Sequence, residues 1–270
     1  MKCIPVLELN SMSADPHRLI EKSENAYADQ ISRAAERIYR ERREKPVVLI
    51  SGPSGSGKTT TAGRLARLLE DNGCCAHTIS MDNYFLPLTA EELRLAEEGR
   101  FDFESPKRLD TELFKQHIEL LSRCQPIDVP AFDFTIQDRK PGFRLEYKPG
   151  DIVIMEGIHA LNPDVIGHSD EYTNRVYVSV RTRLESGGEL LHPSKIRLMR
   201  RLIRDKLYRG RSITETMEFF KSVERGAVSA ADCALPVGKG YFAAPVEGEA
   251  RVAERREERD DLRAVFAAGL

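Results

Sequence analysis

The sequence contains no tryptophan, no apolar run long enough to span a membrane and no excess of charge of one sign. Its 41 Lys and Arg residues nearly balance 43 Asp and Glu residues, which argues against a protein that mainly coats nucleic acid or an anionic membrane. Residues 1–18 lack the apolar core and cleavage site of a secretion signal. We therefore expect a cytoplasmic protein with no membrane segment and no nucleic-acid partner, and we leave a homo-oligomer open.

Cysteine is also scarce. The odd number of cysteines excludes a complete set of disulfide pairs, and none of them forms a C-x-x-C pair; they are Cys3, Cys74, Cys75, Cys124 and Cys233. This pattern predicts neither a disulfide framework nor a zinc site. Reduced thiols in a cytosolic protein are the expectation.

Apolar runs alternate with helical patterns along the chain, which has 270 residues, 41% of them hydrophobic. Strands are predicted at 47–51, 76–81, 151–155 and 175–180, and helices at 17–44, 60–73, 111–122 and 195–212. Residues 127–147 alternate as a β-hairpin does, and residues 1–15 are expected to be loosely ordered. This order predicts an α/β fold with a parallel sheet of about five strands, wrapped by helices, and a hairpin excursion.

The strongest motif lies directly after the first of these buried strands. Gly52–Thr59 reads GPSGSGKT and matches the phosphate-binding pattern G-x-x-x-x-G-K-[ST]. Glycines let backbone N–H groups turn towards phosphate oxygens, and the following helix adds its positive N-terminal dipole. Lys58 is expected to reach the β- and γ-phosphates and the Thr59 hydroxyl to bind magnesium. The sequence therefore predicts a P-loop for a nucleotide.

The motif does not fix the reaction. The N-K-x-D guanine motif of GTPases is absent, and the strand 151–155 ends in Glu156-Gly157 rather than the Asp or Asp-Glu of motor-type ATPases. A small-molecule kinase needs a carboxylate to accept a proton and cations to hold the phosphoryl group. Asp82, at the tip of a predicted strand, and an Arg-rich segment supply both, although a turn-forming Asp and a solvated Arg-Asp pair such as Arg204-Asp205 are common alternatives.

Six motifs in this order extend the interpretation: GPSGSGKTT, SMDNYF, DFESPKRLD, PAFDF, DIVIMEGI and RLIRDKLYRGRS. Together they resemble the uridine kinase and phosphoribulokinase family of P-loop kinases, and in particular the bacterial uridine-kinase-like nucleoside kinases. The resemblance covers roughly residues 28–226. It implies ATP and Mg²⁺, an Arg-rich lid at about 195–212, and a small-molecule acceptor, most simply the 5′-hydroxyl of a nucleoside.

The resemblance also implies roles for individual residues. Asp82 matches the general base, and catalysis would also use Lys58, Arg204 and Arg209. Thr59 and Glu156 would hold magnesium. The nucleotide phosphates would contact Gly52, Pro53, Ser54, Gly55, Ser56, Gly57, Lys58, Thr59, Thr60, Arg201, Arg204 and Arg209. The acceptor would contact Asp82, Tyr84, Phe85, Glu104, Phe132, Phe134, Gln137, Arg139 and Arg211.

Three positions depart from the uridine/cytidine kinase pattern. Glu104 stands where Asp is common, Phe132 where a Tyr would hydrogen-bond the pyrimidine, and Gln137 where a His would. Because polar contacts separate substrates by large factors, acceptors of the sugar-phosphate, pantothenate or glycerate type stay open. A phosphorylated acceptor would require basic residues of 100–110, namely Lys107 and Arg108, to line the site. A nucleotide-binding regulator without turnover is the alternative outside the enzyme class.

These observations divide the chain into a helical extension at 1–45, a P-loop kinase domain at 46–226 and a divergent segment at 227–270. The last segment is rich in Ala and Gly, then in Arg and Glu, and no strand is predicted in it. We expect it to leave the sheet one strand short.

Overall fold

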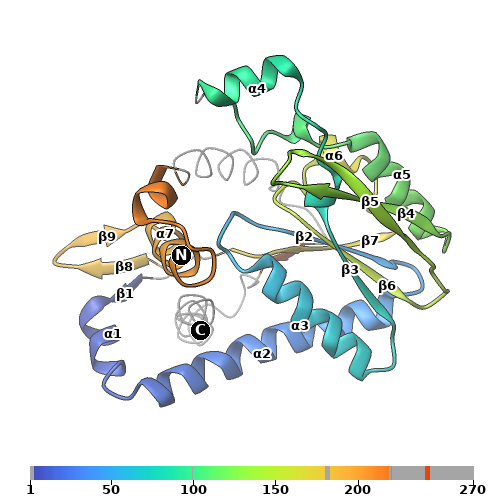
Figure 1. The fold of residues 1–270 in the computed structure, drawn as a ribbon. Coiled ribbons are helices and arrows are strands. Elements are labelled where there is room, and N and C mark those ends of the chain that lie inside the picture. The colour runs from blue at the N-terminus through green and yellow to red at the C-terminus, as the bar shows by residue number, and fades with distance from the viewer. Residues whose placement is uncertain (1–2, 99, 180–182, 219, 221–240, 244–270) are drawn as a thin grey trace.

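A five-stranded parallel sheet forms the centre of the protein (Figure 1). The computed structural model describes residues 3–98, 100–179, 183–218, 220 and 241–243. Across the sheet the strand order is β10-β7-β2-β6-β3, and all neighbours are parallel. The strands are β2 (Val47–Ser51), β3 (Ala76–Ser80), β6 (Ile152–Glu156), β7 (Thr173–Tyr177) and β10 (Tyr241–Ala243). The predicted α/β class is confirmed.

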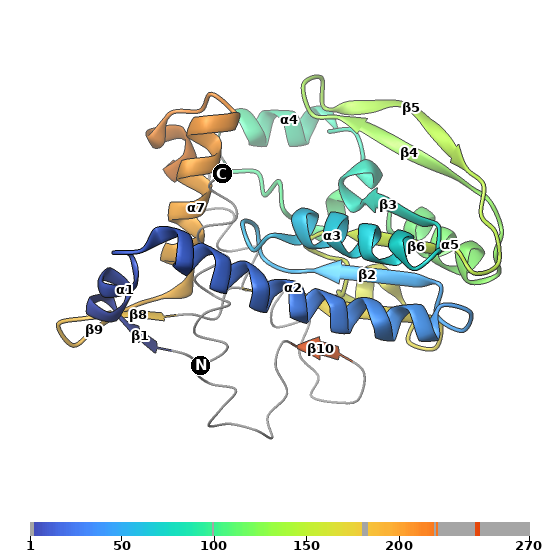
Figure 2. The same cartoon turned by 90° about the horizontal axis from the view of Figure 1, so that it is seen from below.

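Successive residues of each central strand enter two different cores. Val47 and Leu49 of β2 pack in a core with α5 (Thr111–Ser122) and α6 (Pro163–Ile166). Val48 and Ile50 pack instead with α2 (Pro16–Glu41) and α3 (Lys58–Asp71). The sheet is buried on both faces, as a parallel sheet requires, and Figure 2 shows α2 running alongside α3.

A two-stranded hairpin, β4 (Ile127–Asp133) and β5 (Asp138–Leu145), projects from the sheet on the α5 side, as predicted (Figure 1). Short elements gather near the carboxyl ends of β3 and β2. They are the 3-10 turn η1 (Met81–Tyr84), α4 (Ala90–Glu97), the 3-10 turn η2 (Pro106–Arg108) and α7 (Pro193–Tyr208). Asp110 caps α5 through a 3.1 Å hydrogen bond from the Leu113 N–H.

Two expectations about the chain ends were wrong. Residues 1–15 are not loosely ordered, because β1 (Cys3–Pro5) and α1 (Val6–Met12) form there, and Ile4 packs against Leu19 of α2. β1 joins a second small sheet with β8 (Arg183–Ser186) and β9 (Glu189–Leu191). At the other end, residues 241–243 add a strand beside β7, so the sheet is not one strand short. The rest of 227–270 lies outside the described residues.

Within the described part of the chain, no helix combines the length and apolar character that crossing a bilayer demands.

Candidate functional site

The phosphate-binding loop lies at the carboxyl end of the central strand. β2 ends at Ser51 and α3 begins at Lys58, so residues 52–57 form a turn between a buried strand and a helix N-terminus. Gly57 precedes the helix with φ of 104°, a backbone conformation that favours glycine. A cavity of about 490 Å³ opens beside the loop, a size typical of small-ligand sites. It is lined by Ser54, Gly55, Gly57, Lys58, Thr59, Thr60, Asp82, Phe85, Phe103, Glu104, Phe134, Glu156, Gly157, Ile158, Arg200, Arg201, Arg204 and Arg209.

Two oxygen-bearing side chains meet on the loop side of this cavity. The Thr59 hydroxyl donates a hydrogen bond to the Glu156 carboxylate at 2.9 Å. Glu156 ends β6, and the next residue has room only for glycine, because a Cβ on Gly157 would lie 2.5 Å from that of Met81. The absence of a side chain at Gly157 therefore allows the segments that follow β3 and β6 to lie close together. A hydroxyl beside a carboxylate is the oxygen donor set that suits magnesium.

Lys58 and Asp82 both line the cavity. Burial lowers the pKa of Lys58, while the charges of Glu156, Asp82 and Glu104 oppose that shift. Desolvation by the surrounding protein raises the pKa of Asp82, and the charge of Glu156 raises it further. The positive charge of Lys58 acts in the opposite direction. Its carboxylate still faces the open cavity, which it lines. The site therefore places a strengthened proton acceptor next to a phosphate-binding lysine.

Glu104 is a second carboxyl group with a raised pKa. Burial raises the pKa of Glu104 to about 7, although Arg201 and Lys58 act in the opposite direction. Its backbone carbonyl accepts a 2.7 Å hydrogen bond from Nε2 of the buried His159, which follows β6. Since a carbonyl can only accept, His159 carries its proton on Nε2. This bond fixes the loop that holds Glu104 at the mouth of the cavity.

The predicted lid arginines come from the end of α7 and the residues after it. Arg201, Arg204 and Arg209 line the cavity, whereas Arg211 does not. Arg201 also donates to the Ser54 hydroxyl at 3.0 Å, which connects α7 to the P-loop.

Asp205 organises these arginines. Its carboxylate is fully covered and accepts hydrogen bonds from Arg204 at 2.9 and 3.0 Å. Burial alone would raise the pKa of Asp205, but the Arg204 hydrogen bonds and the neighbouring guanidinium charges outweigh it and lower the pKa. Arg201, Arg209 and Arg211 approach the same carboxylate at 3.4, 3.7 and 4.0 Å. Arg204 and Asp205 therefore belong to a larger cluster of charges around a buried carboxylate, not to an isolated solvated pair.

Arg200 was missed by sequence reasoning. It lines the cavity and is 5% exposed, yet among the described residues its Nε and Nη1 atoms have no hydrogen-bond partner. Burial lowers the pKa of Arg200 to about 10, so it stays charged at neutral pH. Two buried guanidinium nitrogens without a partner beside a P-loop are suited to binding an anion. The available signal was its place one turn before Arg204 in the Arg-rich helix.

The acceptor side of the cavity is aromatic. Phe85 and Phe134 line it as predicted, and Phe103, which was not predicted, lines it too. Phe132 is 5% exposed and supports this wall from behind, with its ring centre 5.8 Å from that of Phe85 and 5.0 Å from that of Phe134. Flat aromatic faces at this edge suit a planar group.

Three other predicted acceptor residues lie away from the cavity lining. Tyr84 is fully buried, stacks edge-on against Phe114 and shares a 2.8 Å hydrogen bond with His117, so it is a core residue. Arg139 pairs with Asp110 at 2.7 Å, and the Gln137 amide donates to the Phe134 carbonyl within the hairpin turn.

Several other residues from the predictions take positions around the site. Gly52, Pro53 and Ser56 build the P-loop without lining the cavity. Arg108 is 3% exposed and lies over the Phe85 and Phe101 rings, and neither it nor Lys107 lines the cavity. The requirement for a phosphorylated acceptor is therefore not met at 100–110.

Comparison with known proteins gives a consistent result. The profile of the "Phosphoribulokinase / Uridine kinase family" matches residues 47–230. A uridine kinase of Geobacillus kaustophilus is 31% identical over 183 residues, covering 67% of this chain and 78% of that protein. A uridine kinase of Halobacterium salinarum is 30% identical over 174 residues, covering 64% and 68%.

A solved structure supports the fold. The crystal structure of a candidate fructose transport system kinase from Silicibacter sp. TM1040 covers 78% of this chain and 98% of its own, with a TM-score of 0.58 and 20% identity. The P-loop, the carboxylate beside it, the arginine lid and the family match lead to one conclusion: the chain belongs to the phosphoribulokinase and uridine kinase family and is a phosphotransferase that acts on a hydroxyl group.

Proposed function

We propose that the protein transfers the γ-phosphoryl group of Mg-ATP to the 5′-hydroxyl of a nucleoside. The proposal rests on the position of Asp82. Its carboxylate has a raised pKa and lines the same cavity as Lys58 and three aromatic side chains. A base with a raised pKa is a better proton acceptor for a hydroxyl that attacks phosphorus.

The chain's residues divide the work between the two substrates. Backbone N–H groups of the P-loop and the Lys58 ammonium hold the nucleotide phosphates, and Arg200, Arg201, Arg204 and Arg209 face the charge of the transferred phosphoryl group. Magnesium bound by Thr59 and Glu156 would neutralise phosphate charge. Asp82 takes the proton from the acceptor hydroxyl.

The acceptor side favours an uncharged planar molecule with hydroxyl groups. Phe85, Phe103 and Phe134 offer faces for a base, and Glu104 offers a carboxyl group for ribose hydroxyls. The pKa of Glu104 near 7 allows it to donate or accept a hydrogen bond at neutral pH. With Phe132 behind the aromatic wall and Gln137 bonded to the hairpin backbone, we infer that stacking and ribose contacts decide acceptor choice more than polar contacts to the base.

The proposed catalytic unit is 46–226, with 1–45 as an extension packed on it. The contact between them is specific, because Tyr27 of α2 shares a 2.7 Å hydrogen bond with Thr61 of α3, and Glu24 pairs with Arg64 at 2.7 Å.

The test is ADP release from Mg-ATP against a panel of nucleosides, sugars and hydroxy acids. We expect a nucleoside to give the highest turnover, and Asp82→Asn to lower kcat by about 10²–10⁴-fold because the general base is lost. Asp71→Asn, an exposed carboxylate at the end of α3, serves as the matched control and leaves kcat unchanged. Higher turnover with a sugar or hydroxy acid would replace the nucleoside assignment. ATP binding without turnover for any acceptor would identify a nucleotide-binding regulator instead.

A further inference from the structure

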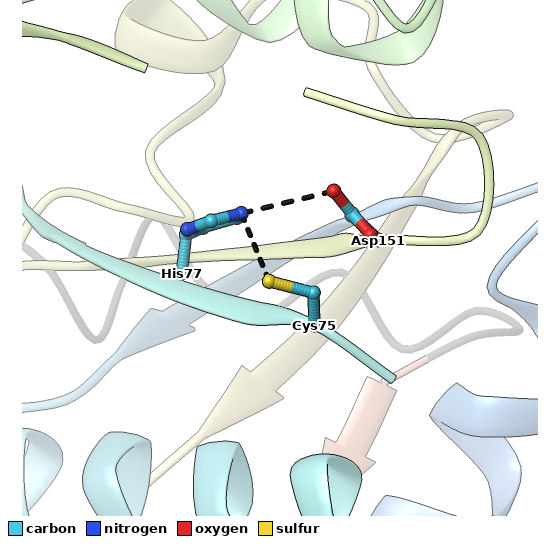
Figure 3. A group of neighbouring side chains, drawn as sticks. All are labelled: Cys75, His77 and Asp151. Carbon is cyan, nitrogen blue, oxygen red and sulfur yellow. Dashed lines mark hydrogen bonds and ion pairs between the residues drawn. The ribbon is translucent and has the colours of Figure 1, made fainter. Parts of the chain in front are cut away.

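A second cluster of reactive side chains lies at the amino ends of β3 and β6, away from the phosphate-binding cavity. It contains Cys75, His77 and Asp151, whose ligand atoms all lie within 4.8 Å of one another (Figure 3). The Cys75 Sγ is 3.4 Å from His77 Nε2, and that nitrogen is 3.8 Å from Asp151 Oδ2. Absence of a C-x-x-C pair had predicted no zinc site, but the third ligand here comes from a distant part of the chain.

The sheet register brings these residues together. Cys75 directly precedes β3 and His77 is the second residue of that strand, so in the extended chain their side chains point to the same side. In the parallel β3–β6 pairing Ala76 lies opposite Ile152, which places Cys75 next to Asp151 at the start of the neighbouring strand. The Ile152 N–H donates to the Cys75 carbonyl at 2.9 Å and fixes this register.

Two of the three distances between ligand atoms are close to those around a tetrahedral transition-metal ion, and the third is within 4.8 Å. Zinc binds sulfur at about 2.3 Å and nitrogen or oxygen at about 2.0–2.1 Å, so tetrahedral ligand atoms lie about 3.6 Å apart for S···N and about 3.3 Å for N···O. The Sγ···Nε2 distance of 3.4 Å meets this requirement, and the Nε2···Oδ2 distance of 3.8 Å closes with a small side-chain rotation. Magnesium, which prefers six oxygen ligands, does not suit a thiol and an imidazole.

Asp151 is held in place by hydrogen bonds, and Cys75 is accessible. The Lys148 N–H donates to Asp151 Oδ2 at 3.0 Å, and the Tyr147 hydroxyl donates to the Asp151 carbonyl at 2.7 Å. Cys75 is exposed, which leaves an approach for the ion and room for a fourth ligand from solvent. The adjacent Cys74 is buried, and its thiol faces the Gly150 carbonyl at 3.2 Å, so it does not compete.

We propose that Cys75, His77 and Asp151 form a binding site for a divalent transition-metal ion such as Zn²⁺, separate from the magnesium site of the kinase. The ion replaces the thiol proton, which leaves to solvent, and joins β3 to β6. Asp151 and Glu156 are five residue steps apart along the strand, roughly 17 Å, so the bound ion does not reach the phosphates.

Cobalt titration of the full chain in the absence of nucleotide tests the site. We expect about one equivalent of Co²⁺ to produce a near-ultraviolet thiolate-to-cobalt absorption band that Zn²⁺ removes and excess Mg²⁺ does not. Cys75→Ser should abolish the band, and His77→Asn should weaken Co²⁺ binding at least tenfold. Cys3→Ser, an exposed thiol in the other sheet, is the matched control and should leave the band unchanged. A band that survives in Cys75→Ser, or no band in the wild-type protein, would overturn the proposal.

A second measurement uses only the wild-type chain, so that misfolding of a variant cannot decide the result. Alkylation of the individual cysteines is followed by mass spectrometry with and without Zn²⁺. Cys75 should be alkylated at least tenfold more slowly with Zn²⁺, whereas Cys3 should react at the same rate. Equal protection of both thiols, or of neither, would contradict the site.

Discussion

The two ends of β3 and β6 carry different chemistry on the same pair of strands. At the carboxyl ends, Asp82 and Glu156 face a helix N-terminus, a lysine and several guanidinium groups. At the amino ends, the exposed Cys75 and the half-buried His77 and Asp151 point toward one another (Figure 3). Neighbouring parallel strands place side chains within reach of one another at both ends. The identity of the side chains then decides whether phosphate and magnesium or a softer metal ion fits.

Loss of Lys58 should produce the largest difference between the two ends. Lys58→Met removes the cation that we propose to contact the transferred phosphoryl group, and we expect kcat to fall by about 10²–10³-fold. Co²⁺ affinity at Cys75 should not change, because the amino ends of β3 and β6 lie about one strand length, roughly 17 Å, from their carboxyl ends. Steady-state ADP release and cobalt titration of the same preparation measure both quantities. A parallel loss of cobalt binding would mean that the two ends are coupled.

Substitution of Arg200 should have a smaller effect than loss of Lys58, and one mainly on nucleotide binding. Because Nε and Nη1 of Arg200 are buried without a hydrogen-bond partner among the described residues, Arg200→Ala should raise KM for ATP by about 10–100-fold through loss of a charged hydrogen bond, with a smaller change in kcat. Arg67→Ala on the exposed face of α3 is the control. If Arg200→Ala matched Arg67→Ala, Arg200 would have a packing role alone.

The pH dependence of stability should reveal the weakest of these effects. The folded-state pKa of Glu104 is raised to about 7, so the folded protein holds a proton that the unfolded chain releases near 4.5. The stabilisation is present below pH 4.5 and is lost as the pH rises towards 7. Glu104→Gln should make the free energy of unfolding less dependent on pH between about 4.5 and 7. Denaturant titration at several pH values measures this dependence. Glu91→Gln, an exposed residue of α4, should leave the slope unchanged.

Local sequence patterns were sufficient to predict most of the fold and the phosphate-binding site. The P-loop, the strand before it and the helix after it are contiguous, so spacing alone was sufficient to predict them. Tyr84 shows where this fails: the 3-10 turn after β3 directs Asp82 outward and Tyr84 inward to His117, and no periodicity distinguishes the two directions.

The remaining parts depend on contacts between distant residues. The partners of Asp205 include arginines of the following loop, and their shared carboxylate becomes visible once the lid is folded. The Cys75, His77 and Asp151 cluster depends on the register of β3 against β6. The strand at 241–243 pairs with β7 despite a composition rich in Ala and Gly around it.

The lid contains four guanidinium groups around one covered carboxylate, so its local charge is positive whenever the cavity holds no anion. In the proposed function, a polyphosphate chain would act there as a counter-ion as well as a reactant. Electrostatic repulsion among the arginines should therefore make the lid the first part of the molecule to open in dilute salt, and phosphate-containing buffers should protect it from proteases. In the proposed function, each turnover would neutralise the charge of these arginines and then restore it, so departure of the phosphorylated product would weaken the hold on the nucleotide diphosphate that remains.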